Sequence, residues 1–480
     1  MLGKNDGQGV NRQQFELVCL EDLVPQDHLL RLIDTHIDFS FIREKVRPFY
    51  CENNGRPSLD PVLLFKMMLI GYLYGIRSER RLEQEIKPNV IYRWFLGLSL
   101  TDPVPDHSTI SWNRTKRFAG TSVFQDVFDE VVRLAMSHNL IGGRVLFTDS
   151  THIQANASSS RYTMQAVTET PQAYLQELEQ AVNEDREAHG KKPLSPAEET
   201  PSEKLAKCST TDPDSGYMTR KGKPEGFHYL DHRTVDHKYN LITDVHVTAG
   251  NVNDSTVYLE RLKRQIDTFG FTKLEAVALD SGYMAPSICH MLQDMNIQAA
   301  IPTRTGGGGS LSITKGQFAY EAASNVYHCP EGQVLRYKTT NRAGYRVYES
   351  DPEQCQACPL RDGCTTNQQS IRTIQRHVWE DSKEWASGYL ATETGQMIYT
   401  MRREMIERSF GDAKELFGFR RCRMRGREKV QEQALMTAVA QNLKKIARIL
   451  ARKAATFGTN CKLAYISLEN PGYRQHLLAS

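Results

Sequence analysis

Hydrophobic spacing changes along the chain, and the changes predict where its folded parts begin. From Leu23 to Phe118, apolar residues recur at helical spacing. Within this stretch, Asp60-Pro61 predicts the start of an apolar helix that ends near Ile76. Asp106 predicts the start of a last helix over residues 110–118. The first 120 residues are therefore expected to form an all-helical domain.

After Gly142-Gly143 the spacing becomes strand-like, with apolar runs of strand length separated by turn residues. The expected strands are residues 144–148, a hairpin of 228–235 and 241–248, residues 274–279 and residues 298–302. Helices are expected between them, over residues 255–269 and 285–295. This order predicts a mixed sheet with flanking helices, of the α+β or α/β class.

Four histidines fall on or beside the expected hairpin: His228, His232, His237 and His246. Such a set could bind a metal ion. Their spacing along the strands favours the simpler interpretation, a solvated face of the sheet.

Two insertions interrupt the strand pattern. Residues 157–225 are acidic, with an expected surface helix over 171–188 and a linker after it, and residues 304–390 carry a crowded set of cysteines. The predicted division is a helix-turn-helix-like domain (1–120), a catalytic core in two parts (121–156 and 226–303), the two insertions (157–225 and 304–390), completion of the core (391–455) and a tail (456–480).

Composition places the chain among globular proteins, with 40% hydrophobic and 24% charged residues. The formal net charge of +3 is too small to argue for nucleic-acid binding by itself. The polar start shows no export signal, and the most apolar run, residues 61–76, is too short to span a bilayer. A cytoplasmic protein without membrane contact is expected.

Four cysteines have the spacing of a structural zinc ribbon, namely Cys329, Cys355, Cys358 and Cys364. A Cys-x2-Cys pair lets two sulfurs converge on one ion, and two further thiols complete a tetrahedral site. Unmetallated thiols on a loop are the alternative. A four-thiol zinc site has no open ligand position, so we expect no catalysis from it.

Basic residues cluster in two places. Residues 420–453 contain eleven basic and two acidic residues, with the densest group at Arg420, Arg421, Arg423 and Arg425. The last N-terminal helix carries Arg114, Lys116 and Arg117. Short helices with a basic last member resemble a helix-turn-helix DNA reader, and a purely structural bundle is the alternative.

Three carboxylates stand out by position: Asp149 and Asp280 directly after apolar strands, and Glu407 on a helix. Arg403, Glu407, Phe410 and Lys414 share one helical face, which alone would suggest a solvated surface. An Asp capping a turn would likewise explain Asp149. Taken together, the three carboxylates could hold two Mg2+ ions for phosphoryl transfer, with Asp149 between the ions.

The chain resembles the DDE transposases of bacterial insertion sequences, which have an RNase H-like core. The matching motifs are Phe147-Thr148-Asp149-Ser150-Thr151, Ala278-Leu279-Asp280-Ser281-Gly282-Tyr283, Arg56-Pro57-Ser58-Leu59-Asp60-Pro61 and Asp106-His107-Ser108-Thr109. Arg403, Glu407 and Lys414 match the Y-x2-R-x3-E-x6-K motif of one large branch. Tyr399 is one residue too far from Arg403, whereas Arg402 has the tyrosine spacing but not the glutamate spacing.

The resemblance implies an enzyme that cuts DNA at the ends of its own element and joins the 3′ ends to a target. It implies Asp149, Asp280 and Glu407 as catalytic ligands of two Mg2+ or Mn2+ ions. Arg403 and Lys414 would contact phosphates, the N-terminal helices would recognise element ends, and the Arg420–Arg427 cluster would add general DNA affinity. Double-stranded DNA, a homodimer on DNA and a bacterial, nucleoid-associated location are expected.

Other functions fit parts of the same pattern. An RNase H-like nuclease would share the three carboxylates but would not join strands. A transposase-derived DNA-binding protein without activity usually lacks one of them. A zinc hydrolase would need an open coordination position, which four thiols do not offer.

Overall fold

A computed structural model describes residues 17–51, 58–168, 175–195, 203–219, 225–303 and 312–469, so Arg56 and Pro57 lie outside the described residues. The chain divides into two compact units. The first comprises residues 1–134, 413–418 and 435–480, and the second comprises residues 135–412 and 419–434. Among the described residues, no helix has the length and apolar composition needed to cross a bilayer.

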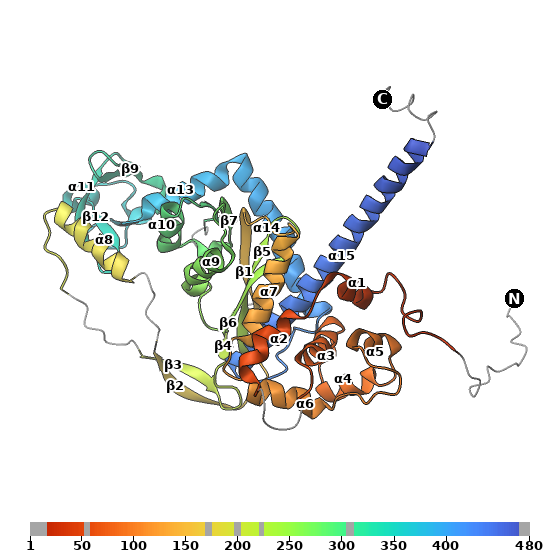
Figure 1. The fold of residues 1–480 in the computed structure, drawn as a ribbon. Coiled ribbons are helices and arrows are strands. Elements are labelled where there is room, and N and C mark those ends of the chain that lie inside the picture. The colour runs from red at the N-terminus through yellow and green to blue at the C-terminus, as the bar shows by residue number, and fades with distance from the viewer. Residues whose placement is uncertain are drawn as a thin grey trace, which may run out of the picture. The chain divides into compact units, whose positions relative to one another are not determined.

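The described N-terminal part of the first unit is helical, as its apolar spacing predicts (Figure 1). Its helices are α1 (Leu29–His36), α2 (Phe41–Val46), α3 (Pro61–Leu73), α4 (Glu79–Ile86), α5 (Val90–Leu96), α6 (His107–Trp112) and α7 (Val123–Ser137), which ends in the second unit. Asp60 and Asp106 cap α3 and α6 by accepting hydrogen bonds from the backbone N–H groups of Val62 and Ser108. Buried rings of Phe65, Phe118 and Phe124 form part of the core.

The last basic helix differs from the prediction. The α-helix α6 ends at Trp112, and Asn113–Arg117 continues as a π-helical turn. The wider turn closes where the Phe118 N–H donates to the Asn113 carbonyl, five residues back. The predicted single helix over residues 110–118 is therefore two pieces.

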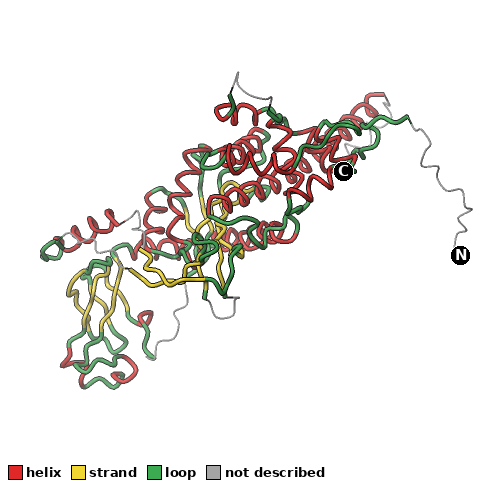
Figure 2. The backbone as a smooth tube through the Cα atoms, turned by 90° about the horizontal axis from the view of Figure 1, so that it is seen from below, coloured by secondary structure: helices red, strands yellow, loops and turns green. Residues whose placement is uncertain are grey.

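A mixed sheet of six strands forms the centre of the second unit, and strands are drawn in yellow in Figure 2. Its strands are β1 (Val145–Gln154), β4 (Gly216–Met218), β5 (Gly226–Asp236), β6 (Ile242–Ala249), β7 (Ala276–Ala278) and β8 (Gln298–Ala300). β1 pairs antiparallel with β5 and parallel with β7, and β7 pairs parallel with β8. The predicted hairpin is confirmed as β5 and β6, which pair antiparallel. The flanking helices are α9 (Ser255–Phe269) and α10 (Pro286–Asp294).

β1 extends further than its apolar pattern predicts. The apolar run ends at Thr148, but the strand continues to Gln154 because β5 pairs with it as far as Gln154. On its other edge, pairing with β7 stops at Phe147. Asp149 therefore lies within β1, next to the position where its parallel neighbour ends.

The prediction of a solvated histidine face is wrong. β5 is buried along its whole length, and His228 and His232 are buried with it. The helix α9 covers this face: Gln265 donates to Thr234 Oγ1 at 3.2 Å, and Arg261 Nε donates to Asp244 at 2.9 Å. Polar and apolar residues alternate along β5 and β6, and a strand with one solvated face shows the same alternation. The sequence pattern alone therefore could not reveal that α9 covers the polar side chains.

The two insertions pack against each other. The first contains β2 (Tyr162–Thr168), α8 (Leu175–Ala188) and β3 (Glu203–Ser209). The second contains β9 (Ala319–Glu321), β10 (Val326–His328), β11 (Val334–Thr340), β12 (Tyr345–Glu349), α11 (Pro352–Gln356), α12 (Arg361–Cys364) and β13 (Thr373–His377), followed by α13 (Glu380–Ala391). Strands β9 to β13 form an antiparallel sheet.

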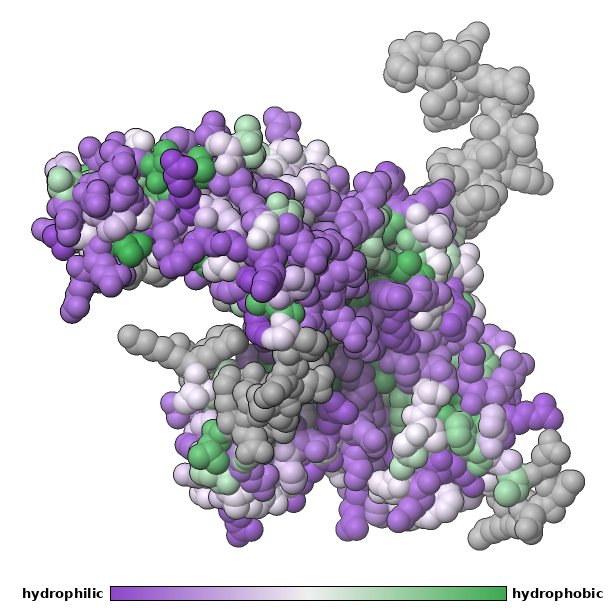
Figure 3. Space-filling view, turned by 90° about the vertical axis from the view of Figure 1, so that its left-hand side faces the viewer, coloured by the Kyte–Doolittle hydropathy of each residue, from purple (hydrophilic) through white to green (hydrophobic). Residues whose placement is uncertain are grey.

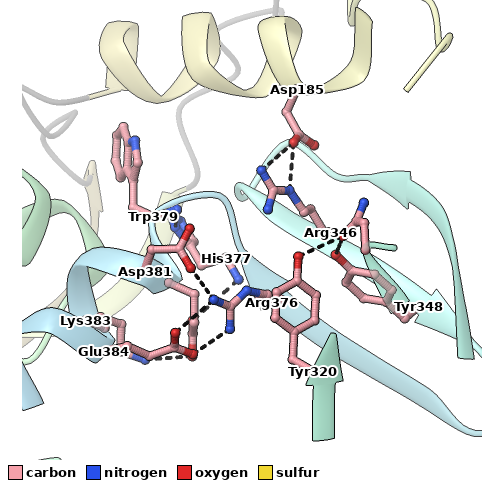
Figure 4. A network of polar contacts seen from close by, with 12 residues as sticks. Asp185, Tyr320, Arg346, Tyr348, Arg376, His377, Trp379, Asp381, Lys383 and Glu384 are labelled. Atoms are coloured by element: carbon pink, nitrogen blue, oxygen red, sulfur yellow. Dashed lines mark hydrogen bonds and ion pairs between the residues drawn. The ribbon is translucent and has the colours of Figure 1, made fainter. Parts of the chain in front are cut away.

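Polar and apolar contacts hold α8 on this second sheet. Asp185 of α8 accepts hydrogen bonds from Arg346 of β12, at 2.7 Å, and from the Thr340 hydroxyl (Figure 4). Leu178 and Val182, also of α8, pack against Trp379. Segments about 150 residues apart in sequence thus form one substructure, a pairing that the separate patterns of the insertions do not predict.

Candidate active site beside strands β1 and β7

Two of the predicted carboxylates occupy matching positions on neighbouring parallel strands. Phe147 of β1 pairs with Ala278 of β7, and Asp149 and Asp280 each lie two residues further on. Residues two apart on a strand point to the same face, so the register places these carboxylates side by side on one face. The two carboxylates are close enough to interact, because the charge on Asp280 adds to burial in raising the pKa of Asp149.

Asp149 is held by two donors. Arg402 Nη2 donates to its Oδ2 at 2.7 Å, and the backbone N–H of Ser150 donates to its Oδ1 at 2.8 Å. The Arg402 side chain is buried, at 5% exposure, and the Asp149 side chain is 24% exposed. The carboxylate is therefore fixed in orientation while part of it stays accessible.

The pKa of Asp149 is raised to about 6. Burial is the main cause, because it disfavours the charged carboxylate. The Arg402 guanidinium and the Ser150 N–H lower this pKa, and the nearby carboxylates of Asp280 and Asp254 raise it. A carboxylate whose pKa is raised strongly by burial and by neighbouring carboxylates is a candidate for a functional site.

Asp254 belongs to this site, and the sequence pattern indicated only a helix cap for it. The residue directly precedes α9, and its Oδ1 accepts a hydrogen bond from Ser150 Oγ at 2.8 Å. Ser150 thus contacts two carboxylates, Asp149 through its backbone and Asp254 through its hydroxyl. The residue in the sequence that could have indicated a second carboxylate is Ser150, directly after Asp149. Its hydroxyl can bond one carboxylate while its backbone N–H bonds another.

The helix carrying Glu407 lies over the same face of the sheet. It is α14 (Glu393–Glu415), and its Arg402 bonds Asp149 while its Phe410 packs on Arg233, the β5 neighbour of Asp149. The guanidinium of Arg402 also lies 5.7 Å from the centre of the Tyr399 ring. Arg402, three residues after Tyr399, thus contacts Asp149, and Arg403 does not.

Glu407 and Arg403 point differently from Arg402. Five residues separate Glu407 from Arg402, a rotation of about 140° around the helix. Both Arg403 and Glu407 are exposed, and neither side chain makes a hydrogen bond or ion pair with the described residues. The structure therefore brings Asp149, Asp280 and Asp254 together and leaves Glu407 without a contact to them. Lys414, further along α14, is half-buried.

Oxygen donors of this kind suit a hard cation such as Mg2+, which takes carboxylates together with water and substrate phosphate. The carboxylate oxygens of Asp149, Asp280 and Glu407 do not all lie within 4.8 Å of one another. Across the described ranges, the one set of three or more ligand atoms within 4.8 Å of each other is Glu83, Asp106 and His107 in the first unit. There, Glu83 accepts from the His107 backbone N–H at 3.0 Å and from Lys87 at 2.6 Å, so its oxygens already serve to join α4 to α6.

The predicted DNA-contacting residues of the first unit are partly engaged within it. Arg114 forms an ion pair with Glu79, and the Arg117 guanidinium lies 4.0 Å from the centre of the Tyr50 ring. Lys116 is exposed. Of the three cations, Lys116 is the most accessible to a ligand.

The basic segment, residues 420–427, lies along the end of β1. The Gln154 N–H donates to the Arg420 carbonyl, and the Cys422 N–H donates to the Gln154 carbonyl. Arg420, Arg421 and Arg425 are exposed, and Arg423 is half-buried. The segment is thus anchored by its backbone, and most of its guanidinium groups reach solvent.

The four predicted zinc thiols line one small cavity, together with apolar side chains of the second sheet. Burial raises the pKa of Cys364, and the other three thiols raise it further. The Gln333 N–H donates to Cys329 Sγ at 3.3 Å. In a tetrahedral zinc site the sulfurs would be about 3.8 Å apart, as Zn–S bonds of about 2.3 Å require. No three of the four thiols, all of them among the described residues, have sulfurs within 4.8 Å of one another, so metal binding would draw them inward.

Comparison with known proteins identifies two segments. Residues 18–116 match the family described as transposase domain (DUF772), and residues 328–447 match the family described as transposase DDE domain. No curated protein sequence matches the chain. The second match includes the thiols and Glu407, but Asp149 and Asp280 precede it.

Structures of Mos1 transposase are among the solved structures similar to this chain. A pre-cleavage Mos1 transpososome shares 9% identity over 52% of this chain and 61% of that chain, with a TM-score of 0.16. The Mos1 mariner paired-end complex with Mn shares 11% identity over 54% and 64%, with a TM-score of 0.17. The similarity thus spans less than two thirds of these two chains.

Proposed function

We propose that this chain is a DDE-type transposase, of the kind that bacterial insertion sequences encode, and that it cleaves DNA at the ends of its own element and joins the freed 3′ ends to target DNA. The observation that carries the proposal is the alignment of Asp149 with Asp280 on parallel strands, beneath a helix that belongs to a transposase DDE domain. The mixed sheet supports an RNase H-like core, with β1 between an antiparallel pair and two parallel strands.

In this proposal Asp149, Asp280 and Glu407 hold two divalent ions, with Asp149 between them. The ions would activate the attacking oxygen and stabilise the leaving oxygen of an in-line displacement at phosphorus. Asp149 is oriented for this role by Arg402 and Ser150. Glu407 is on the helix whose Arg402 contacts Asp149, and its exposed carboxylate would be the third ligand.

The DNA contacts are assigned to cations on α14 and in the basic segment. Arg403 and Lys414 would contact phosphates near the site, and the Arg420–Arg425 group would contact the backbone further away. Recognition of the terminal inverted repeats would fall to the first unit, with Lys116 available for contact. Two element ends must be held together for joining, which favours a homodimer on double-stranded DNA.

The test is cleavage of labelled element-end DNA by single variants. Asp149→Asn, Asp280→Asn and Glu407→Gln should each lower cleavage by at least about a thousandfold while DNA binding survives. Asp267→Asn, an exposed aspartate on α9, is the matched control and should cleave like the wild type. Near-wild-type cleavage by any of the first three would refute the assignment of that residue.

A nuclease without strand transfer is the alternative function. The two are separated by supplying pre-cut element ends with a supercoiled target plasmid. Joined products support the transposase, whereas hydrolysis of the ends without joining supports the nuclease.

We further propose that Cys329, Cys355, Cys358 and Cys364 hold a structural zinc ion. The chemistry of four thiols around one cavity supports this, as does the N–H bond to Cys329. Metal analysis of the purified chain should find about one zinc per chain, and Cys355→Ser should lower this content. A metal-free chain with an intact fold would refute the site.

A further inference from the structure

Strands β2 and β3 form a two-stranded ribbon with a face that no described element covers. Seven residue pairs join them, from Tyr162 with Ser209 to Thr168 with Glu203. An isolated two-stranded ribbon is at best marginally stable in water. A ribbon of this length therefore gains from a partner on its open face.

One face of the ribbon is apolar and exposed. Met164 pairs with Lys207 and Ala166 with Leu205, so Tyr162, Met164 and Leu205 share a face with Lys207. Tyr162 is 43% exposed, Met164 54% and Leu205 73%. The face of the molecule drawn in Figure 3 is mostly hydrophilic, with hydrophobic side chains in small separate patches. A strand pair that displays three large apolar side chains stands out against such a surface.

The ribbon is continuous with the basic segment. Its first strand follows the end of β1, where Gln154 forms a bridge with Arg421, and Arg425 Nε donates to the Asn156 carbonyl at 2.9 Å. Its second strand leads to Asp212, which accepts from the Gly426 N–H at 2.9 Å. Both strands are thus joined to the segment that carries the exposed arginines, at the end of the ribbon where Tyr162 pairs with Ser209.

Positive charge also reaches the ribbon itself. Arg161, directly before β2, is exposed. The Lys207 ammonium lies over two rings, 5.0 Å from the centre of Tyr162 and 4.4 Å from that of Tyr217. The apolar face is therefore bordered by cations, which complements a polyanion.

A second copy of the chain fits this face poorly. A stable protein interface needs about 20–30 residues on each side, and this face offers three large apolar side chains. DNA fits better, because a groove admits a two-stranded ribbon, and groove-binding proteins combine Arg or Lys with apolar side chains that press against base steps.

We propose that the β2–β3 ribbon is a DNA-contacting arm, with Met164 and Leu205 against a groove of double-stranded DNA and the arginines of the basic segment on the adjacent phosphates. The choice of DNA as the partner of this arm rests on the proposed function. It adds a contact that neither family match covers, since both exclude residues 162–209.

The test uses the full chain with Met164→Ser and Leu205→Ser together. The control is Met295→Ser with Leu175→Ser, two side chains of the second unit that are 38% and 45% exposed outside the ribbon. Binding is measured by fluorescence anisotropy with a labelled duplex carrying one element end, and DNA bending by energy transfer between dyes at its two ends. Sedimentation without DNA reports self-association, and circular dichroism reports folding.

The ribbon variant should bind the duplex roughly tenfold more weakly than the wild type and bend it less, while the control stays within about twofold. Leu205→Ser alone should change affinity in the same direction, which keeps the test valid if the double variant folds poorly. DNA binding and bending equal to the control would overturn the arm. Altered self-association with unchanged DNA affinity would also overturn it, in favour of a second copy.

These outcomes separate the arm from the proposed function. A ribbon variant that binds DNA normally refutes the arm alone, provided that the wild type binds and cleaves element ends. A wild-type chain that binds no DNA refutes both.

Discussion

At the scale of single residues, burial raises the pKa of Asp149 most, and the charges around this carboxylate adjust it. Arg402 lowers the pKa of this carboxylate, and Asp280 and Asp254 raise it. The two influences can be changed one at a time, because Arg402 and Asp254 approach Asp149 from different elements, α14 and the start of α9.

Removing the cation should make Asp149 harder to ionise. Arg402→Ala should move the acid limb of the cleavage pH profile upward by roughly one unit or more, since an adjacent arginine lowers an aspartate pKa by about that amount. Arg402→Lys keeps the charge and should keep the limb near its wild-type position. A wild-type profile for Arg402→Ala would show that the arginine does not act on Asp149.

The opposite shift is expected at Asp254. Asp254→Asn keeps an oxygen to accept the Ser150 hydroxyl but removes the negative charge that raises the Asp149 pKa. The acid limb should therefore move downward by a fraction of a unit, with cleavage retained. Complete loss of cleavage in a folded Asp254→Asn variant would contradict this positioning role and indicate a metal ligand.

At the scale of elements, the strand register could be predicted and the helix rotation could not. Two apolar runs that each end in Asp-Ser predict aspartates at one sheet edge, because parallel strands align their ends. The rotation of α14 depends on which residues its neighbours bury. Ile406, Ser409 and Phe410 are buried there, which turns Arg402 toward Asp149 and Arg403 toward solvent.

The covering of β5 and β6 by α9 has a measurable pH effect. His232 is buried, its Nε2 shares a hydrogen bond with Thr248 Oγ1 at 2.8 Å, and burial followed by the nearby His246 lowers its pKa to about 3. The unfolded chain binds a proton near pH 6.5, and the native state does not, so stability present above this pH is lost as pH falls toward 3.

Between pH 7.5 and pH 5, His232 alone should cost about 2 kcal/mol of unfolding free energy. Urea denaturation of the wild type and of His232→Gln checks this. The variant should be less stable at pH 7.5 but should lose less stability on acidification. Equal losses in the two proteins would contradict a neutral, buried His232.

At the scale of the whole molecule, the chain order of the parts could be predicted, but some of their associations could not. The helical start, the mixed sheet and the cysteine-bearing insertion follow from local patterns. The packing of α8 on the second sheet depends on Asp185, whose partners Arg346 and Thr340 lie about 150 residues away. No periodicity within either insertion indicates such a pairing.

The central claim, that Asp149 and Asp280 hold a divalent ion, is tested most directly by Mn2+ binding to the purified chain with element-end DNA. Titration followed by electron paramagnetic resonance should show binding by the wild type, and affinity lower by about tenfold or more in Asp149→Asn and in Asp280→Asn. Asp267→Asn should bind like the wild type. Unchanged Mn2+ affinity in Asp149→Asn would contradict the account.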